Sequence, residues 1–431
     1  MAYDSLQSAH QMASNRKQTN SSTFGGELQN SPAVRANAGL IDIELFAGGG
    51  GMAVGLRQAG FAPVNFYESN GECCDTLIKN TLEDNATLVG KVIRGKTEQV
   101  DWRPFQGNVR LLAGGAPCQP FSLGGKHHAH RDDRNLFPEA LRAVRETKPM
   151  AVLLENVRGI VRNSFRFYFE YVLRQLQFPS VAPRENEKWR DHDGRLKRLE
   201  LKDAPEYHVV FRLLDAADFG VPQNRLRVFI VATRADFPAY IFPNKTHSRE
   251  MLENVLHGKE YWERHGIARP SINGKNGHLK LDEDMLLPWV TVRDALTGLP
   301  IPAGNEANAQ MNHWIIPGAR SYQGHTGSQM DWTAKTIKAG VHGVPGGENT
   351  LIDASGKFRY FTLRETARIQ TFPDKHIFTG ARIHVTRQIG NAVPSRLATA
   401  VASPLYNLIS TELAVRARLK VNGVGKEEKS K

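Results

Sequence analysis

The sequence predicts a doubly wound α/β core with mostly parallel strands, interrupted by a second, loop-rich domain. Short apolar runs alternate with helical patterns along the first half of the chain, which is typical of a sheet covered by helices. From about residue 236 to 356, glycine, asparagine, histidine and proline become frequent and long periodic segments are scarce. Because those residues favour turns over regular elements, we interpret this stretch as the second domain.

The core elements follow from the spacing of apolar residues. Strands are expected where short apolar runs are bounded by turn residues, at 40–46, 109–113, 150–154 and 228–232. Helices are expected where apolar residues recur at helical spacing, at 52–59, 136–144, 165–176, 363–371 and 395–408. The charged stretch at 184–202 is interpreted as a solvated surface excursion.

These patterns divide the chain into four parts. Residues 39–236 and 357–412 form the core, and residues 237–356 form the inserted domain. Residues 1–38 are rich in Ser, Asn, Gln and Gly, and residues 413–431 include the polar run KVNGVGKEEKSK. Neither end carries a sustained apolar pattern, so both are expected to be flexible tails.

Composition restricts the class of protein. The 431 residues include 56 Lys+Arg and 44 Asp+Glu, a formal net charge of +12 that favours a polyanionic partner such as nucleic acid. No apolar run reaches the roughly 18 residues of a membrane span. The cysteines, Cys73, Cys74 and Cys118, are too few for a disulfide framework. We therefore expect a cytoplasmic protein without a membrane segment.

A glycine-rich loop indicates a nucleoside-binding site. The strand at 40–46 runs into Ala47-Gly48-Gly49-Gly50-Gly51 and then into a helix, so the backbone and the helix amides can approach a ligand. Glu68 ends a second apolar stretch, where its carboxylate can bind both hydroxyls of a ribose. Gly49, Gly51 and Gly55 also fit a loose dinucleotide fingerprint. A nicotinamide cofactor and a ligand-free turn therefore remain as alternatives.

Two further strand ends carry reactive groups. Cys118 follows the strand at 109–113 between two prolines, at the edge where α/β proteins place their sites. Glu155 lies at the end of the next strand, and the segment 123–135, with glycines, histidines and basic residues, is suited to closing over an anionic substrate. The alternatives are a buried, inert thiol for Cys118 and a helix-start carboxylate for Glu155. The histidines lack the partners of a metal site.

Taken together, these motifs resemble the DNA cytosine C5 methyltransferases of the bacterial restriction-modification type. The matching motifs, in family order, are FAGGGG at 46–51, GAPCQPFS at 115–122, ENV at 155–157, DFGVPQNRLR at 218–227, the helix at 363–373 and QIGNAVP at 388–394. The resemblance implies a Rossmann-like methyltransferase core, S-adenosylmethionine as the cofactor and double-stranded DNA as the partner.

The resemblance also assigns catalytic roles. Cys118 adds to C6 of a flipped cytosine, which makes C5 nucleophilic. Glu155 binds N3, while Arg227, with Arg225 beside it, faces O2 and the thiol, where negative charge develops. The segment 123–135 becomes the lid. Residues expected to contact the substrate are Pro117, Gln119 and Ser122.

The cofactor residues are likewise implied by the resemblance. They comprise Phe46 against the adenine, the backbone of Ala47, Gly48, Gly50 and Gly51 near the methionine end, Glu68 on the ribose, and Leu136 and Asn391 closing the site. Two positions depart from the family. Glu44 replaces the usual aspartate, and residues 95–99 lack the aspartate that commonly holds the adenine amino group.

The inserted domain is expected to read the DNA sequence, although its spacing does not reveal which bases. Its polar candidates are Asn312, His313, Arg320, Ser321, Tyr322, His325, Lys335, Lys338 and the segment 340–348. A monomer is expected. The alternatives are a tRNA cytosine methyltransferase, which the second domain disfavours, a non-catalytic DNA-binding relative, and a nicotinamide oxidoreductase.

Overall fold

The computed structural model describes residues 39–62, 64–82, 86–117, 136–270, 286–302, 312–321, 326–340, 349–353 and 355–427. The predicted tail at 1–38 lies outside this range. Contacts divide the chain into two units, residues 39–409 and a unit of which residues 410–427 are described. Among the described residues, no helix has the length and apolarity of a transmembrane helix.

A seven-stranded sheet organises the described part of the core, in the order β3-β2-β1-β4-β5-β7-β6. Strands β1 to β5 are parallel, whereas β7 is antiparallel to both β5 and β6. The strands are β1 (Ile41–Leu45), β2 (Val64–Glu68), β3 (Gly90–Arg94), β4 (Val109–Gly115), β5 (Ala151–Val157), β6 (Tyr207–Asp215) and β7 (Leu226–Arg234). The predicted α/β class and mostly parallel sheet are confirmed. The reversed direction of β7 is not visible in its apolar run.

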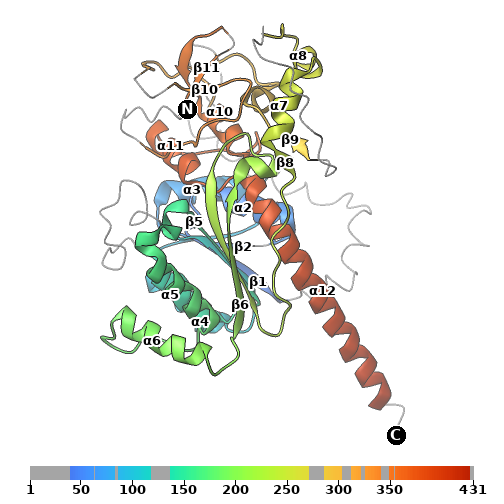
Figure 1. Ribbon diagram of the computed structural model, residues 1–431. Helices are drawn as coiled ribbons and strands as arrows, with labels where there is room; N and C mark the ends of the chain where they lie inside the picture. The colour runs from blue at the N-terminus through green and yellow to red at the C-terminus, as the bar shows by residue number, and fades with distance from the viewer. Residues whose placement is uncertain are drawn as a thin grey trace, which may run out of the picture. The chain divides into compact units, whose positions relative to one another are not determined.

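Helices cover both faces of the sheet (Figure 1). On one face, Ile43 and Leu45 of β1 pack in a core with α4 (Phe137–Thr147) and α5 (Arg166–Gln177). On the other face, Val64 and Phe66 of β2 pack in a core with four helices. These are α2 (Gly51–Ala59), α3 (Gly71–Leu82), α10 (Leu363–Ile369) and α11 (Arg382–Asn391). Because both faces are covered, the inner strands are buried and largely apolar, and the buried charges of Asp42 on β1 and Arg110 on β4 pair with each other.

The charged stretch at 184–202 differs from its prediction as a solvated excursion. It contains the helix α6 (Trp189–Glu200), whose residues His192, Asp193 and Leu196 are buried. Asp193 pairs with Nε of Arg174 on α5 at 2.8 Å, and Nδ1 of His192 lies 2.7 Å from the Tyr171 hydroxyl. Charged residues are buried here because each finds a partner on α5.

The region 237–356 is built from short elements, in keeping with its loop-rich composition. Its described elements are β8 (His247–Ser248), α7 (Arg249–His257), α8 (Glu260–Arg264), β9 (Leu287–Pro288), α9 (Val292–Leu296), β10 (Ser328–Gln329) and β11 (Thr350–Ile352). Strand β12 (Phe358–Tyr360) completes a small sheet with β10 and β11. Short 3-10 turns elsewhere are Thr97–Gln99, Arg103–Phe105, Arg158–Val161, Asn163–Phe165 and Ala216–Phe219.

The end of the chain is more regular than predicted. Helix α12 spans Ser395–Glu427, so residues 413–427 are helical where a flexible tail was expected. Glu412 and Arg416 form an ion pair of 2.9 Å one turn apart, which supports helix in this polar stretch. Residues 428–431 lie outside the described range.

A close helix contact gives a stability prediction. A Cβ on Gly55 of α2 would lie 2.4 Å from Cβ of Ala398 and 2.6 Å from the Ser395 carbonyl oxygen. We expect Gly55→Ala to lower the free energy of unfolding by about 1–3 kcal/mol through overpacking. The matched control is Gly194→Ala in α6, where the nearest atom is 3.8 Å away; it should stabilise by up to about 1 kcal/mol. Urea denaturation compares them, and equal stabilities would contradict the prediction.

Candidate functional site

The glycine loop turns sharply between β1 and α2. Phe46 has φ 56°, and Gly48 and Gly50 also have positive φ. Glycine adopts this region without cost, whereas for Phe46 it is strained. The Ala47 amide donates to the Tyr67 carbonyl at 3.3 Å, which ties the loop to the end of β2. The backbone strain is therefore concentrated where the loop begins.

The loop also packs tightly against α11 and the residues that follow it. A Cβ on Gly51 would lie 2.4 Å from the Val393 carbonyl oxygen, and one on Gly49 would lie 3.0 Å from Cβ of Gln388. Only glycine fits such a close approach of backbone to neighbouring atoms. The run of glycines is thus required by packing between two distant parts of the chain.

Glu68 is held at the end of β2 by two backbone amides. Its Oε2 accepts from the Gly48 amide at 2.8 Å and its Oε1 accepts from the Asn70 amide at 2.7 Å. Each carboxylate oxygen has a second lone pair that can accept from a ligand hydroxyl. The carboxylate is therefore oriented without being saturated.

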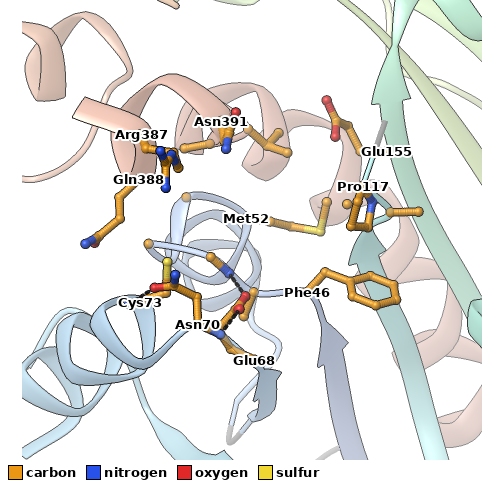
Figure 2. A pocket seen from close by; sticks show the side chains of 18 of the residues that line it. Phe46, Met52, Glu68, Asn70, Cys73, Pro117, Glu155, Arg387, Gln388 and Asn391 are labelled. Atoms are coloured by element: carbon orange, nitrogen blue, oxygen red, sulfur yellow. Dashed lines mark hydrogen bonds between the residues drawn. The ribbon is translucent and has the colours of Figure 1, made fainter. Parts of the chain in front are cut away.

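These groups face a cavity of about 340 Å³. Figure 2 shows Arg387, Gln388 and Asn391 of α11 across the cavity from Glu68 and Cys73. At its other end lie Phe46, Pro117 and Glu155. Leu136 and Arg227 also line the cavity. A second cavity of about 280 Å³ shares Phe46, Glu68, Pro117 and Leu136 with the first and adds residues 95–98. The two together offer an elongated site for one ligand.

A buried ion pair lies between strands β5 and β7. Arg227 Nε and Glu155 Oε1 are 2.8 Å apart, and both side chains are mostly buried. Burial raises the pKa of Glu155, an effect that the cations of Arg227 and Arg225 oppose. A Cβ on Gly115 would lie 3.3 Å from Glu155 Oε2, so glycine at that position leaves the carboxylate room. The Glu155 carboxyl is therefore buried and paired, and its pKa is raised in spite of the neighbouring cations.

Next to this pair, Asn156 links the ends of β4 and β5. Its Nδ2 donates to the Ala116 carbonyl at 3.1 Å, and its Oδ1 accepts from the Val157 amide at 2.9 Å. The chain leading through Pro117 toward residue 118 is thereby fixed beside Glu155.

Arg225 does not line the cavity, in contrast to the expectation that it faces the substrate beside Arg227. It is buried, and its guanidinium donates to the carbonyls of Ile337 at 2.8 Å, Gly390 at 2.6 Å and Ala392 at 3.1 Å. The guanidinium of Arg225 is therefore bound to backbone carbonyls of the inserted region and of the end of α11. Its influence on Glu155 is electrostatic.

The structure brings together most of the other predicted residues. Those that line the first cavity are Phe46, Ala47, Gly48, Gly51, Glu68, Pro117, Leu136, Glu155, Arg227 and Asn391. Gly50 is not among the lining residues. A Cβ at its position would contact Leu77, Leu88 and His376. Cys118, Gln119, Ser122 and the segment 123–135 lie outside the described residues.

Several lining residues were not singled out from the sequence. They include Met52, Asn70, Cys73, His384, Arg387 and Gln388. One signal was available, since 384, 387, 388 and 391 share one helix face by their spacing. That spacing has meaning only once α11 is known to face the glycine loop.

Among the residues predicted to read the DNA sequence, His313 is not available to contact DNA. It is buried, with Nδ1 2.8 Å from the Thr362 hydroxyl and Nε2 2.8 Å from the Pro300 carbonyl oxygen. Arg320 and Lys338 are exposed. Tyr322, His325 and residues 341–348 lie outside the described range.

The sheet with its antiparallel β7, the glycine loop after β1 and the carboxylate after β2 define a Rossmann-like α/β protein of the methyltransferase class. The chain belongs to the C-5 cytosine-specific DNA methylases, whose family model matches residues 40–178 and 195–407. The family predicted from the motifs is thus confirmed. Members of this family use S-adenosylmethionine as their methyl donor.

Curated relatives agree over most of the chain. The Type II methyltransferase M.Eco47II of Escherichia coli is 30% identical over 376 residues, covering 85% of this chain and 79% of the relative. M.NgoMIV of Neisseria gonorrhoeae is 31% identical over 379 residues, covering 86% and 98%. A solved E. coli prophage protein described as a DNA modification methyltransferase has a TM-score of 0.51 at 20% identity, covering 86% and 99%. That last likeness concerns the fold alone.

The ion pair yields a titration prediction. Arg227→Gln removes the cation that favours the ionised form of Glu155, so the pKa of Glu155 should rise further, and Arg227→Lys should raise it less. Infrared spectra recorded against pH follow the carbonyl stretch of the protonated carboxyl, and subtraction of Glu155→Gln spectra isolates it. An unchanged midpoint in Arg227→Gln would show that the pair does not set this pKa.

Proposed function

We propose that this protein methylates C5 of a cytosine within a specific sequence of double-stranded DNA, as the modification enzyme of a restriction-modification system. The observation that carries the proposal is the family match across both halves of the core, together with a cavity that joins the glycine loop to the Glu155–Arg227 pair. The Type II methyltransferases among its relatives support the same reading.

The cavity suits S-adenosylmethionine. In our proposal Glu68 takes the ribose hydroxyls, Phe46 and Leu136 flank the adenine in the smaller cavity, and Asn391 meets the methionine end. The donor supplies an electrophilic methyl group. The backbone at 95–98 lines the adenine side without an aspartate, so the adenine amino group must be met by other groups there.

The thiol follows a residue that lines the cavity. Cys118 comes directly after Pro117 in the sequence, and in our proposal its thiol, ionised to the thiolate, is the nucleophile. A bond forms between Sγ of Cys118 and C6 of the cytosine, and the ring electrons move toward N3 and C5. C5 then accepts the methyl group. Loss of the C5 proton and breakage of the S–C6 bond restore the aromatic ring.

Glu155 and Arg227 act where charge appears on the ring. Because burial raises the pKa of Glu155, its carboxyl can hold a proton and donate it to N3 as the thiolate adds. Arg227, paired with Glu155 at 2.8 Å, is placed to stabilise charge at O2. Arg225 acts on Glu155 only through its charge, while its guanidinium donates to the backbone carbonyls of Ile337 and Gly390.

The target cytosine must leave the duplex to reach this buried pair. We assign the lid to the segment 123–135, and the reading of the DNA sequence to residues 237–356. Exposed Arg320 and Lys338 are proposed phosphate contacts. The enzyme is proposed to act as a cytoplasmic monomer.

The covalent step predicts a trapped adduct. DNA that carries 5-fluorocytosine at the target cannot lose a C5 proton after methyl transfer, so the S–C6 bond should persist. A denaturation-resistant complex is expected on gels only when S-adenosylmethionine is present, and Cys118→Ala should abolish it. An adduct of equal yield in Cys118→Ala would assign the nucleophile elsewhere.

The substrate class is tested in cells. Bisulfite sequencing of DNA from cells that express the protein should show complete protection at one cytosine of one short sequence, and Cys118→Ala should show none. If labelled methyl groups appear in tRNA while the DNA stays unmodified, the assignment to DNA is wrong.

A further inference from the structure

A buried histidine far along the chain contacts the glycine loop from behind the cavity. His376 lies between α10 and α11 and is fully buried. Its Nε2 is 3.0 Å from the Gly49 carbonyl oxygen, and its Nδ1 is 2.7 Å from the Thr87 hydroxyl. His376 does not line either cavity, so its side chain reaches the ligand site only through the loop.

The protonation state of this ring follows from its surroundings. Burial lowers the pKa of His376 to about 3, so the ring is neutral near pH 7 and one nitrogen carries the proton. A carbonyl oxygen only accepts, and therefore Nε2 must donate to Gly49. Nδ1 is then the acceptor for the Thr87 hydroxyl. The Gly49 contact thus fixes the tautomer, whereas Nδ1 of His376 and Oδ1 of Asn80, 3.1 Å from the Thr87 hydroxyl, are both acceptors for its one proton.

The ring is held in place on its remaining sides. The rings of Phe372 and Phe378 lie 4.9 and 5.0 Å from that of His376, centre to centre. The next residue, Ile377, is anchored to α3, because Asn80 donates to its carbonyl at 2.7 Å and accepts from its amide at 3.0 Å. Helix α3 directly follows the strand that carries Glu68. His376 and the Glu68 carboxylate are therefore both held by the β2–α3 unit.

The loop is thus fixed at two successive residues by two different side chains. Gly48 donates its amide to Glu68 at 2.8 Å, and Gly49 accepts from His376. Gly50, which follows, has φ 86°, and a Cβ there would lie 3.5 Å from Cε1 of the histidine. A glycine run without such contacts would sample many backbone shapes.

We propose that His376 is a positioning residue for the cofactor, which holds the glycine loop in its binding shape through the hydrogen bond from Nε2 to Gly49. This inference rests on the proposed function. His376 touches neither the cofactor nor the DNA. Its loss should therefore weaken cofactor binding by about tenfold, while the rate at saturating cofactor changes little.

Two amide substitutions separate this role from general packing. In His376→Gln the side-chain amide nitrogen can take the place of Nε2 and donate to Gly49. In His376→Asn the shorter side chain reaches only toward Thr87. His376→Phe keeps the ring volume and removes both contacts. Thr87→Val removes the contact with Nδ1 of His376 together with the hydrogen bond from the Thr87 hydroxyl to Asn80, and leaves the contact with Gly49.

The measurement is calorimetric binding of S-adenosylhomocysteine to the full-length protein, with KM for S-adenosylmethionine, kcat and Tm for each variant. We expect His376→Gln to bind within about threefold of wild type and His376→Asn and His376→Phe about tenfold more weakly. In those two variants KM rises while kcat stays within about twofold. Thr87→Val should lower Tm with little change in affinity.

Equal affinities for His376→Gln and His376→Asn would overturn the proposal, as would losses of affinity that follow Tm across all four variants. The amide pair still decides the question if His376→Phe does not fold. Wild-type protein that binds no S-adenosylhomocysteine would instead count against the proposed function itself.

Discussion

The site depends on one constraint, which is that neighbouring parallel strands end at the same edge of the sheet. Leu45 of β1 pairs with Tyr67 of β2 and with Gly114 of β4, and Gly115 pairs with Glu155 of β5. Backbone hydrogen bonding alone therefore brings together the glycine loop, the carboxylates of Glu68 and Glu155, and the chain that leads to Cys118. Side-chain contacts then fix the orientation of the groups that the strand register brings together.

The antiparallel β7 adds the cation that a purely parallel sheet would lack. Its register sets Arg227 opposite Val157, so the guanidinium reaches Glu155. Burial and charge oppose each other at this carboxyl, and burial prevails because its pKa is raised. The balance suits a group that exchanges a proton during the reaction. Arg225, two residues earlier, serves the backbone instead.

The C-terminal part of the core completes the site from the other side. Gln370 donates to the carbonyls of Ile389 and Ala392 and accepts from Gln223, which positions the end of α11 near Asn391. His376 holds the glycine loop at Gly49. The contact of His376 with Gly49 spans 327 residues and that of Gln370 with Gln223 spans 147. Each is buried, so a missing partner would leave a polar group unsatisfied. The cavity is thus lined by residues from both the N-terminal and the C-terminal parts of the core.

Sequence alone determined the α/β class, the glycine loop, Glu68, Glu155 and the family, because these depend on local periodicity and on motifs that have fixed chemical requirements. Tertiary structure decided the direction of β7, the burial of His313 and α6, and the inward turn of Arg225. Those features depend on which distant residues form ion pairs or hydrogen bonds with a buried charged or polar group. Neither periodicity nor residue spacing shows which residues will pair in this way. Likewise, Arg387 lines the cavity and His376 contacts Gly49 only because α11 and the turn before it pack against the glycine loop.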